Sequence, residues 1–146
     1  MNISKNPFNP EVPFFRRWLS GWLPFWAYST LVFKGAILPA SQIPRFLYRF
    51  NDKFLHASEF FVLFFISEHA FHMAKRWLSR HPGILAYGYC AFMGVATEVA
   101  QHFAKDRTPE FYDFLADIAG AGLAFLCYLL ILLHHYRRTG AARRGE

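Results

Sequence analysis

Long apolar stretches, separated by clusters of basic residues, dominate this sequence. Leu115–Leu133 contains one charged residue, Asp117, and Ile84–Val99 contains one, Glu98. A soluble globular chain interrupts its apolar runs every few residues, where each helix or strand turns a polar side to water. Stretches of about 20 mostly apolar residues are long enough to cross a lipid bilayer as helices. The sequence therefore predicts an all-α fold that passes through a membrane several times.

Four segments have the length and composition of a transmembrane helix. They extend approximately over residues 21–38, 52–74, 82–103 and 109–134. The last segment has a favourable start, with Thr108 as N-cap, Pro109 at the first helical position and an acidic residue in the first turn. Residues 12–20 mix aromatic side chains with Arg16 and Arg17, and we interpret them as an interfacial segment. The predicted fold is thus four transmembrane helices preceded by an N-terminal interfacial segment.

Small residues recur at a spacing of four in the last two predicted spans. Residues four apart lie on one face of a helix, and small side chains on that face allow two helix backbones to approach closely. We therefore expect close helix contacts along both stripes. The stripes consist of Ala96, Ala100 and Ala104 in the third span and Ala116, Gly120 and Ala124 in the fourth.

The distribution of Lys and Arg predicts the orientation of the spans. Ten of these residues flank one side, in the N-terminal segment, the loop between the second and third spans, and the C-terminal tail, and five flank the other side. Because an excess of Lys and Arg marks the cytoplasmic side, both termini are predicted to be cytoplasmic. The domain organisation follows as a cytoplasmic and interfacial segment (1–20), a transmembrane domain (21–135) and a basic cytoplasmic tail (136–146). The N-terminus shows no pattern of a cleavable signal peptide.

The net charge of +6 is also typical of proteins that bind nucleic acids. Here the basic residues flank apolar spans instead of lining one face of a domain, so nucleic acid is not an expected partner. The two cysteines exclude a disulfide-rich scaffold.

Ionisable residues within three predicted spans fall in one layer of the membrane. At a rise of 1.5 Å per residue, His56 and Asp113 lie about 6 Å below the outer edge. By the same measure Glu98 lies about 7–8 Å down and Asp117 about 12 Å down. Charged groups at such depths are costly and must face other helices or a wet cavity. The sequence therefore predicts a polar pocket that opens to the outside.

This layer carries groups suited to acid–base chemistry on an ester or phosphate group. Glu98 or Asp117 would act as the base and His56 as its acid–base partner. Arg107, in the short loop above the layer, could hold a phosphate or carboxylate through two hydrogen bonds. The residues expected to bind a ligand are Gln101, Arg107 and Asp113.

Two other interpretations of these residues stay open. In the first, Arg107, His56, Glu98 and Asp117 satisfy one another and only hold the helices together. In the second, His56 with Glu98, Asp113 and Asp117 supplies mixed nitrogen and oxygen ligands to a metal ion. The sequence contains no compact ligand motif such as HExxH, so neither a metal nor another cofactor is predicted.

Three motifs in this order resemble a known family. Asp52–Ala57 reads DKFLHA, Gly94–Gln101 reads GVATEVAQ, and Arg107–Gly120 reads RTPEFYDFLADIAG. Their polar positions resemble those of the VanZ-like family of small membrane proteins, whose pattern is approximately DKxxH, ExxQ and R-x5-D-x3-[ND]-x2-G. The resemblance covers roughly residues 45–125 and adds Lys53 to the candidate binding residues. Arg107 follows Lys105-Asp106 here, where relatives more often have Pro-Gly.

The resemblance implies a polytopic helical protein from a family named for an accessory protein of glycopeptide-antibiotic resistance, with no settled general activity. The leading hypothesis is a pocket that binds, and could modify, a membrane lipid or a lipid-linked precursor of the cell envelope. One alternative is a non-catalytic accessory protein in antibiotic tolerance or envelope maintenance, whose buried charges are structural. Another is a proton-coupled carrier. The expected location is the bacterial cytoplasmic membrane, and whether the protein is an enzyme stays open.

Overall fold

The computed structural model describes residues 18–39, 42, 51–74, 78–104 and 108–142, and within these ranges the chain is helical with no strand. Side chains are described as far as residue 139. The elements are η2 (Trp18–Trp22, a π-helical turn), α2 (Leu23–Ile37), α3 (Asp52–His72), η5 (Leu78–Arg80, a 3-10 turn), α4 (Pro82–Phe103) and α5 (Phe111–Ala142). The predicted all-α fold is confirmed.

Within the described part of the chain, three helices are long and apolar enough to cross a membrane: α3, α4 and the segment Phe111–Thr139 of α5. The prediction of a multi-pass membrane protein is therefore confirmed in its coarser form. Helix α2 has 15 residues and is about 22 Å long, whereas the hydrocarbon core of a bilayer is about 30 Å thick. The fourth crossing stays a prediction. Most of the predicted interfacial segment lies outside the described residues.

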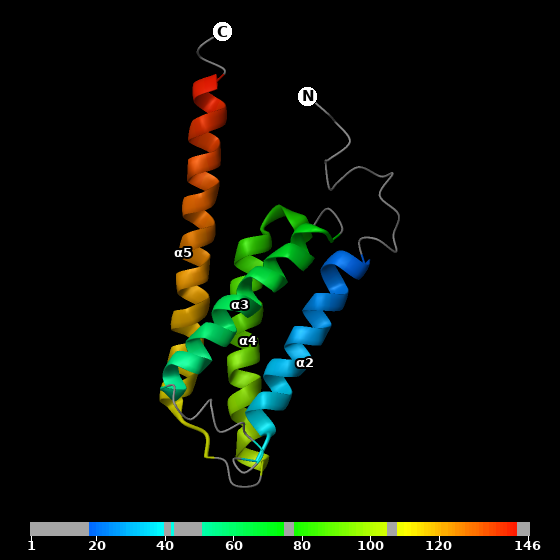
Figure 1. Ribbon diagram of the computed structural model, residues 1–146, viewed down its shortest axis with the longest axis vertical. Helices are drawn as coiled ribbons and strands as arrows, with labels where there is room; N and C mark the ends of the chain where they lie inside the picture. The colour runs from blue at the N-terminus through cyan, green and yellow to red at the C-terminus, as the bar shows by residue number, and fades with distance from the viewer. Residues whose placement is uncertain (1–17, 40–41, 43–50, 75–77, 105–107, 143–146) are drawn as a thin grey trace.

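The helices alternate in direction along the chain (Figure 1). Helices α2 and α4 begin at the end of the bundle where α3 and α5 finish, so α3 and α5 begin at the opposite end. This alternation brings the first turns of α3 and α5 together with the last turns of α4. The last turns of α5 project beyond the other helices (Figure 1).

Helix α3 is the central element, because it packs most extensively on α5 and also contacts α4 and α2. Its buried face carries Phe60, Leu63 and Phe64, which belong to the same buried cluster as Ala121 and Ala124 of α5. These large side chains fill the space between the helices in the apolar half of the bundle.

Gly120 lies where the backbones of α3 and α5 come into close contact. A Cβ atom built on Gly120 would lie 2.6 Å from the carbonyl carbon of Ala57 and 2.7 Å from its Cα. Backbone meets backbone at this point, and any side chain would separate the helices. The predicted role of the stripe Ala116, Gly120 and Ala124 is thus confirmed at its middle position.

The predicted bounds of the last span differ from the structure at both ends. The helix begins at Phe111, and Thr108, Pro109 and Glu110 precede it without regular structure. The predicted helix start with Pro109 in the first turn was therefore wrong by two residues. A physical reason is the ion pair of Glu110 with Lys53 of α3, which holds the chain against the neighbouring helix. At the other end α5 continues through residue 136, where the basic tail was predicted to begin, as far as Ala142.

Candidate functional site

The start of α3 places Asp52, Lys53 and His56 at one end of the bundle. Asn51 is the N-cap, and its side-chain oxygen accepts a hydrogen bond of 2.9 Å from the backbone N–H of Lys53. The negative charge of Asp52, in the first turn, is stabilised by the positive end of the helix dipole. His56 follows Asp52 by four residues and Lys53 by three, so each of them is a neighbour of His56 on the helix surface.

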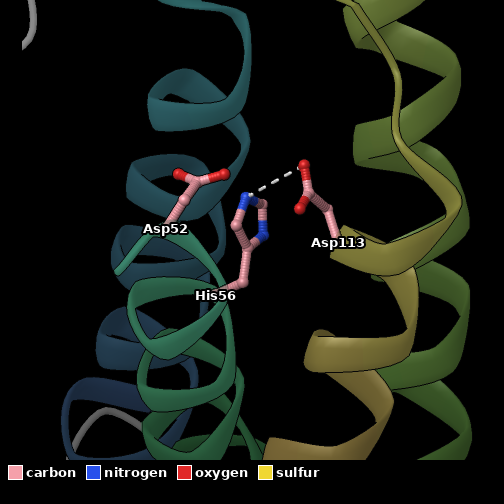
Figure 2. Close-up of side chains that lie close together, drawn as sticks. All are labelled: Asp52, His56 and Asp113. Carbon is pink, nitrogen blue, oxygen red and sulfur yellow. Dashed lines mark ion pairs between the residues drawn. The ribbon is translucent and has the colours of Figure 1, made fainter. Parts of the chain in front are cut away.

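His56 lies between two aspartates of α5. Its Nδ1 atom donates a hydrogen bond to Asp117 Oδ1 at 2.9 Å. Its Nε2 atom lies 3.8 Å from Asp113 Oδ2, and Figure 2 shows the imidazole ring between Asp113 and Asp52. Because the Asp117 carboxylate can only accept, its hydrogen bond places the proton on Nδ1 and leaves the Nε2 lone pair directed away from it.

In this cluster burial increases from His56 through Asp113 to Asp117. The His56 side chain is 16% exposed, that of Asp113 7% and that of Asp117 0%. Asp117 Oδ2 has no hydrogen-bond partner among the residues that the structure describes. A buried carboxylate with one unsatisfied oxygen is costly, so it indicates a constraint other than stability.

Lys53 connects the two helices at the mouth of the cluster. Its ammonium group donates to the carboxylates of Asp113 and, at 2.7 Å, Glu110. Asp52 lies 4.0 Å away. Lys53, which the sequence places among the ligand-binding residues, therefore has its charge balanced by protein carboxylates.

Helix α4 contributes Glu98 and Gln101. The Glu98 carboxyl group accepts a hydrogen bond from the backbone N–H of Glu110. Glu98 Oε1 and Gln101 Oε1 are buried without a partner within the described ranges. Gln101 is 3% exposed. Helix α4 thus adds two unsatisfied acceptors to the same end of the bundle.

The structure brings together six of the seven residues that the sequence predicts for the site. They lie at the starts of α3 and α5 and near the end of α4. The seventh, Arg107, lies outside the described residues. Asp52 was missed as a site residue, although its position four residues before His56 was a signal for it.

The atoms best placed for a metal ion differ from the predicted set. Ligand atoms of Asp52, His56 and Asp113 all lie within 4.8 Å of one another. The predicted set had Glu98 and Asp117 in place of Asp52. In the structure Asp117 binds the inner nitrogen of His56 instead.

Comparison with known proteins identifies the family of this chain. The sequence model of the VanZ/LLP1 family matches residues 6–132. The chain belongs to the VanZ/LLP1 family. The predicted VanZ-like resemblance is therefore confirmed, and the match extends on both sides beyond the motifs that suggested it.

A relative of this VanZ/LLP1 protein occurs in Schizosaccharomyces pombe. This uncharacterised protein is 33% identical over 105 residues, which make up 72% of this chain and 58% of the relative. The chain thus spans less than two thirds of that relative. No solved structure matches the chain. Family membership supports an integral membrane protein, and it leaves the reaction and the ligand to be inferred from the site.

The ion pair at the mouth of the site gives a pH-dependent prediction. The hydrogen bond from Lys53 lowers the pKa of the exposed Glu110 carboxyl below its ordinary value of 4.5. The pair therefore favours the folded state above about pH 4.5, and this contribution is lost as the pH falls through the lowered pKa. Lys53→Met should return the pKa of Glu110 towards its ordinary value. A pH titration of the Glu110 side-chain carbon resonance measures this shift.

Glu110→Gln assigns the resonance, and Lys34→Met, which removes an exposed lysine of α2, is the control. An unchanged pKa of Glu110 in Lys53→Met would show that the ion pair does not form in the membrane-embedded protein.

Proposed function

We propose that this VanZ/LLP1 protein binds and chemically modifies the polar part of a membrane lipid or a lipid-linked envelope molecule. The proposal includes four crossings of a bacterial cytoplasmic membrane, with both termini in the cytoplasm. The alternating helix directions (Figure 1) and the excess of Lys and Arg on one side support this topology. The polar cluster would then lie near the outer surface, level with lipid headgroups.

The observation that carries the proposal is the hydrogen bond between the fully buried Asp117 and His56 Nδ1. It orients the imidazole and directs Nε2 towards the more open side of the cluster, where a headgroup would lie. A histidine held in this way by a carboxylate is a general acid–base group. Asp117 therefore acts through His56, as a positioning residue, rather than as the base itself.

Glu98 is the second acid–base candidate. Its buried oxygen, which has no partner among the described residues, comes from a different helix from that of His56, so the two groups could act on one bound molecule. Gln101, with its own unsatisfied oxygen, is suited to accept a hydrogen bond from a ligand hydroxyl or amide. Arg107 in the adjacent loop would provide the positive charge for a phosphate, because Lys53 is already paired.

One set of contacts favours a non-catalytic accessory protein as the second candidate. Lys53 with Asp113, and His56 with Asp117, form cross-helix pairs that join α3 to α5, and Lys53 also pairs with Glu110 just before α5. Such pairs would hold the fold even without a ligand. Among the described residues, Asp117, Glu98 and Gln101 each have an oxygen without a partner; these oxygens favour the binding function, because a purely structural network would satisfy its members.

A lipid-turnover experiment tests the proposed function. The purified full chain, in liposomes of a bacterial polar lipid extract, is expected to change one lipid class without an ion gradient. Glu98→Gln should lower this rate by about 100-fold, since a positioned acid–base group typically contributes at least that factor. Mass spectrometry of the extracted lipids over time measures both rates.

Glu59→Gln, which replaces an exposed carboxylate of α3, is the matched control and should retain the rate. If the wild-type chain neither enriches nor changes any lipid class, the proposal fails and the non-catalytic accessory role is favoured instead. Uptake that requires a pH gradient would favour the proton-coupled carrier instead.

A further inference from the structure

Three ligand-type atoms from two helices face one another at the mouth of the site. They belong to Asp52 and His56 of α3 and to Asp113 of α5, and all lie within 4.8 Å of one another. Figure 2 shows the imidazole of His56 between the two carboxylates, with Asp52 on one side and Asp113 on the other. Two carboxylate oxygens and one imidazole nitrogen form a common ligand set for a divalent metal ion.

Asp117 provides an independent observation that points to a metal. Histidines that bind metals usually donate their other ring N–H to a carboxylate, which fixes the ring and makes the ligating nitrogen more basic. Asp117 binds His56 Nδ1 in this way, from a position with 0% exposure. The nitrogen left for the metal is Nε2, the atom that faces Asp113 Oδ2.

The charge around these atoms also favours a cation. Lys53 is the lysine that bonds to this cluster, and it is shared between Asp113 and Glu110. Among the described residues of this cluster, the carboxylates outnumber the cationic groups even when His56 is protonated. They are Asp52, Asp113 and Asp117, with Glu110 and Glu98 next to them. A divalent ion would offset this excess negative charge, which is most costly at the buried carboxylates Asp113 and Asp117.

The three ligand residues differ in their exposure to solvent, as expected for a metal site with open coordination positions. The side chain of Asp52 is 64% exposed and that of His56 16%. A bound ion would therefore have protein ligands on its inner side and free positions on its outer side, which water or a headgroup oxygen could fill. Lys53 is bonded to Oδ1 of Asp113, which leaves Oδ2 for the ion.

We propose that Asp52, His56 Nε2 and Asp113 bind one divalent transition-metal ion that accepts mixed nitrogen and oxygen ligands, such as Zn²⁺ or Mn²⁺. Asp117 positions His56 for this role. The inference rests on the geometry of the site and does not require the proposed lipid chemistry. If both hold, His56 is a ligand in the metal-loaded protein, and Glu98 is left as the acid–base group beside the ion.

Direct metal binding tests the site without any measurement of turnover. The full chain is purified in detergent, stripped with a chelator and titrated with Zn²⁺ against a coloured competitor. The wild-type protein should bind one equivalent. Asp117→Asn should weaken binding by about 10- to 100-fold, the usual effect of removing a carboxylate behind a metal-bound histidine. Asp52→Asn, at the exposed ligand, should weaken it at least as much.

Glu110→Gln is the matched control, because it removes one negative charge from the same end of the bundle without removing a ligand. It should change the affinity by less than about threefold, the usual context-dependent spread of a single surface charge. Equal losses in Glu110→Gln and Asp52→Asn would show diffuse attraction of cations and would overturn the proposal. So would a wild-type affinity no higher than that of Asp52→Asn, a variant at an exposed position that is expected to fold normally.

A spectroscopic probe separates ligation from general attraction. Co²⁺ in the wild-type protein should give an absorption spectrum typical of nitrogen and oxygen ligands, and Asp117→Asn should shift it by changing the His56 nitrogen. A spectrum equal to that of Co²⁺ in water would contradict the site. A confirmed metal site together with inactive liposomes would refute only the proposed lipid chemistry.

Discussion

Gly120→Ala is expected to destabilise the protein by about 2–3 kcal/mol, although alanine is the better helix former. The added methyl group would lie 2.6 Å from the carbonyl carbon of Ala57. Because the obstacle is the backbone of α3 and not a flexible side chain, the helices must separate to admit it. Unfolding in mixed micelles with increasing SDS measures the loss of free energy.

Gly122→Ala is the matched control on the same helix. Its new methyl group would lie 3.9 Å from Tyr87, an ordinary van der Waals contact. The same substitution should therefore be neutral or stabilise by up to about 1 kcal/mol, the helix propensity difference between Gly and Ala. Equal effects at both glycines would contradict the close approach of α3 and α5.

Gly120→Ala should also disturb the site. Ala57 is adjacent to His56, and Gly120 lies one turn after Asp117, so a separation of the backbones at Gly120 would stretch the hydrogen bond between the two site residues. If the proposed metal site exists, its affinity should fall in Gly120→Ala and stay unchanged in Gly122→Ala.

The membrane spans could be predicted from the sequence because their signal is local. Helix α4 has the predicted bounds, Pro82–Phe103, since an apolar run of this length that begins with proline has few alternatives. The start of α5 could not be predicted in the same way. Its N-cap residues have favourable local preferences, but Glu110 is held by Lys53, which lies on another helix. A contact between distant segments overrode local propensity there.

The composition of the site was predictable, and its internal pairing was not. Helical spacing puts Asp113 and Asp117 on one face, and alternating spans bring them to the depth of His56. The spacing does not decide which aspartate binds which imidazole nitrogen. That choice depends on how far α3 is shifted along its axis relative to α5. The close contact between Gly120 and the backbone of Ala57 constrains this shift. The spacing of Asp52 from His56 indicates that the two are neighbours, but the position of Asp52 near Asp113 depends on how α3 and α5 pack.

His56→Leu is expected to destabilise the protein by about 3–5 kcal/mol, because it leaves the fully buried Asp117 carboxylate without its partner. Asp117→Leu should also destabilise, by removing the acceptor for His56 Nδ1. The double variant should regain most of the loss, since an apolar pair can replace a buried ionic pair at little cost. The same SDS unfolding measurement on all three variants gives the coupling energy of the pair.

This cycle also separates stability from function at the pair. If the pair only holds α3 to α5, the double variant should recover both the fold and any envelope phenotype. If His56 takes part in binding or chemistry, the double variant should fold normally and stay inactive, with lipid turnover as low as that of His56→Leu. Leu115→Ala, which alters an exposed residue of α5, is the control and should preserve both properties. Recovery of turnover in the double variant would refute a functional role for the pair, because two leucines have no group that can bind a metal or transfer a proton.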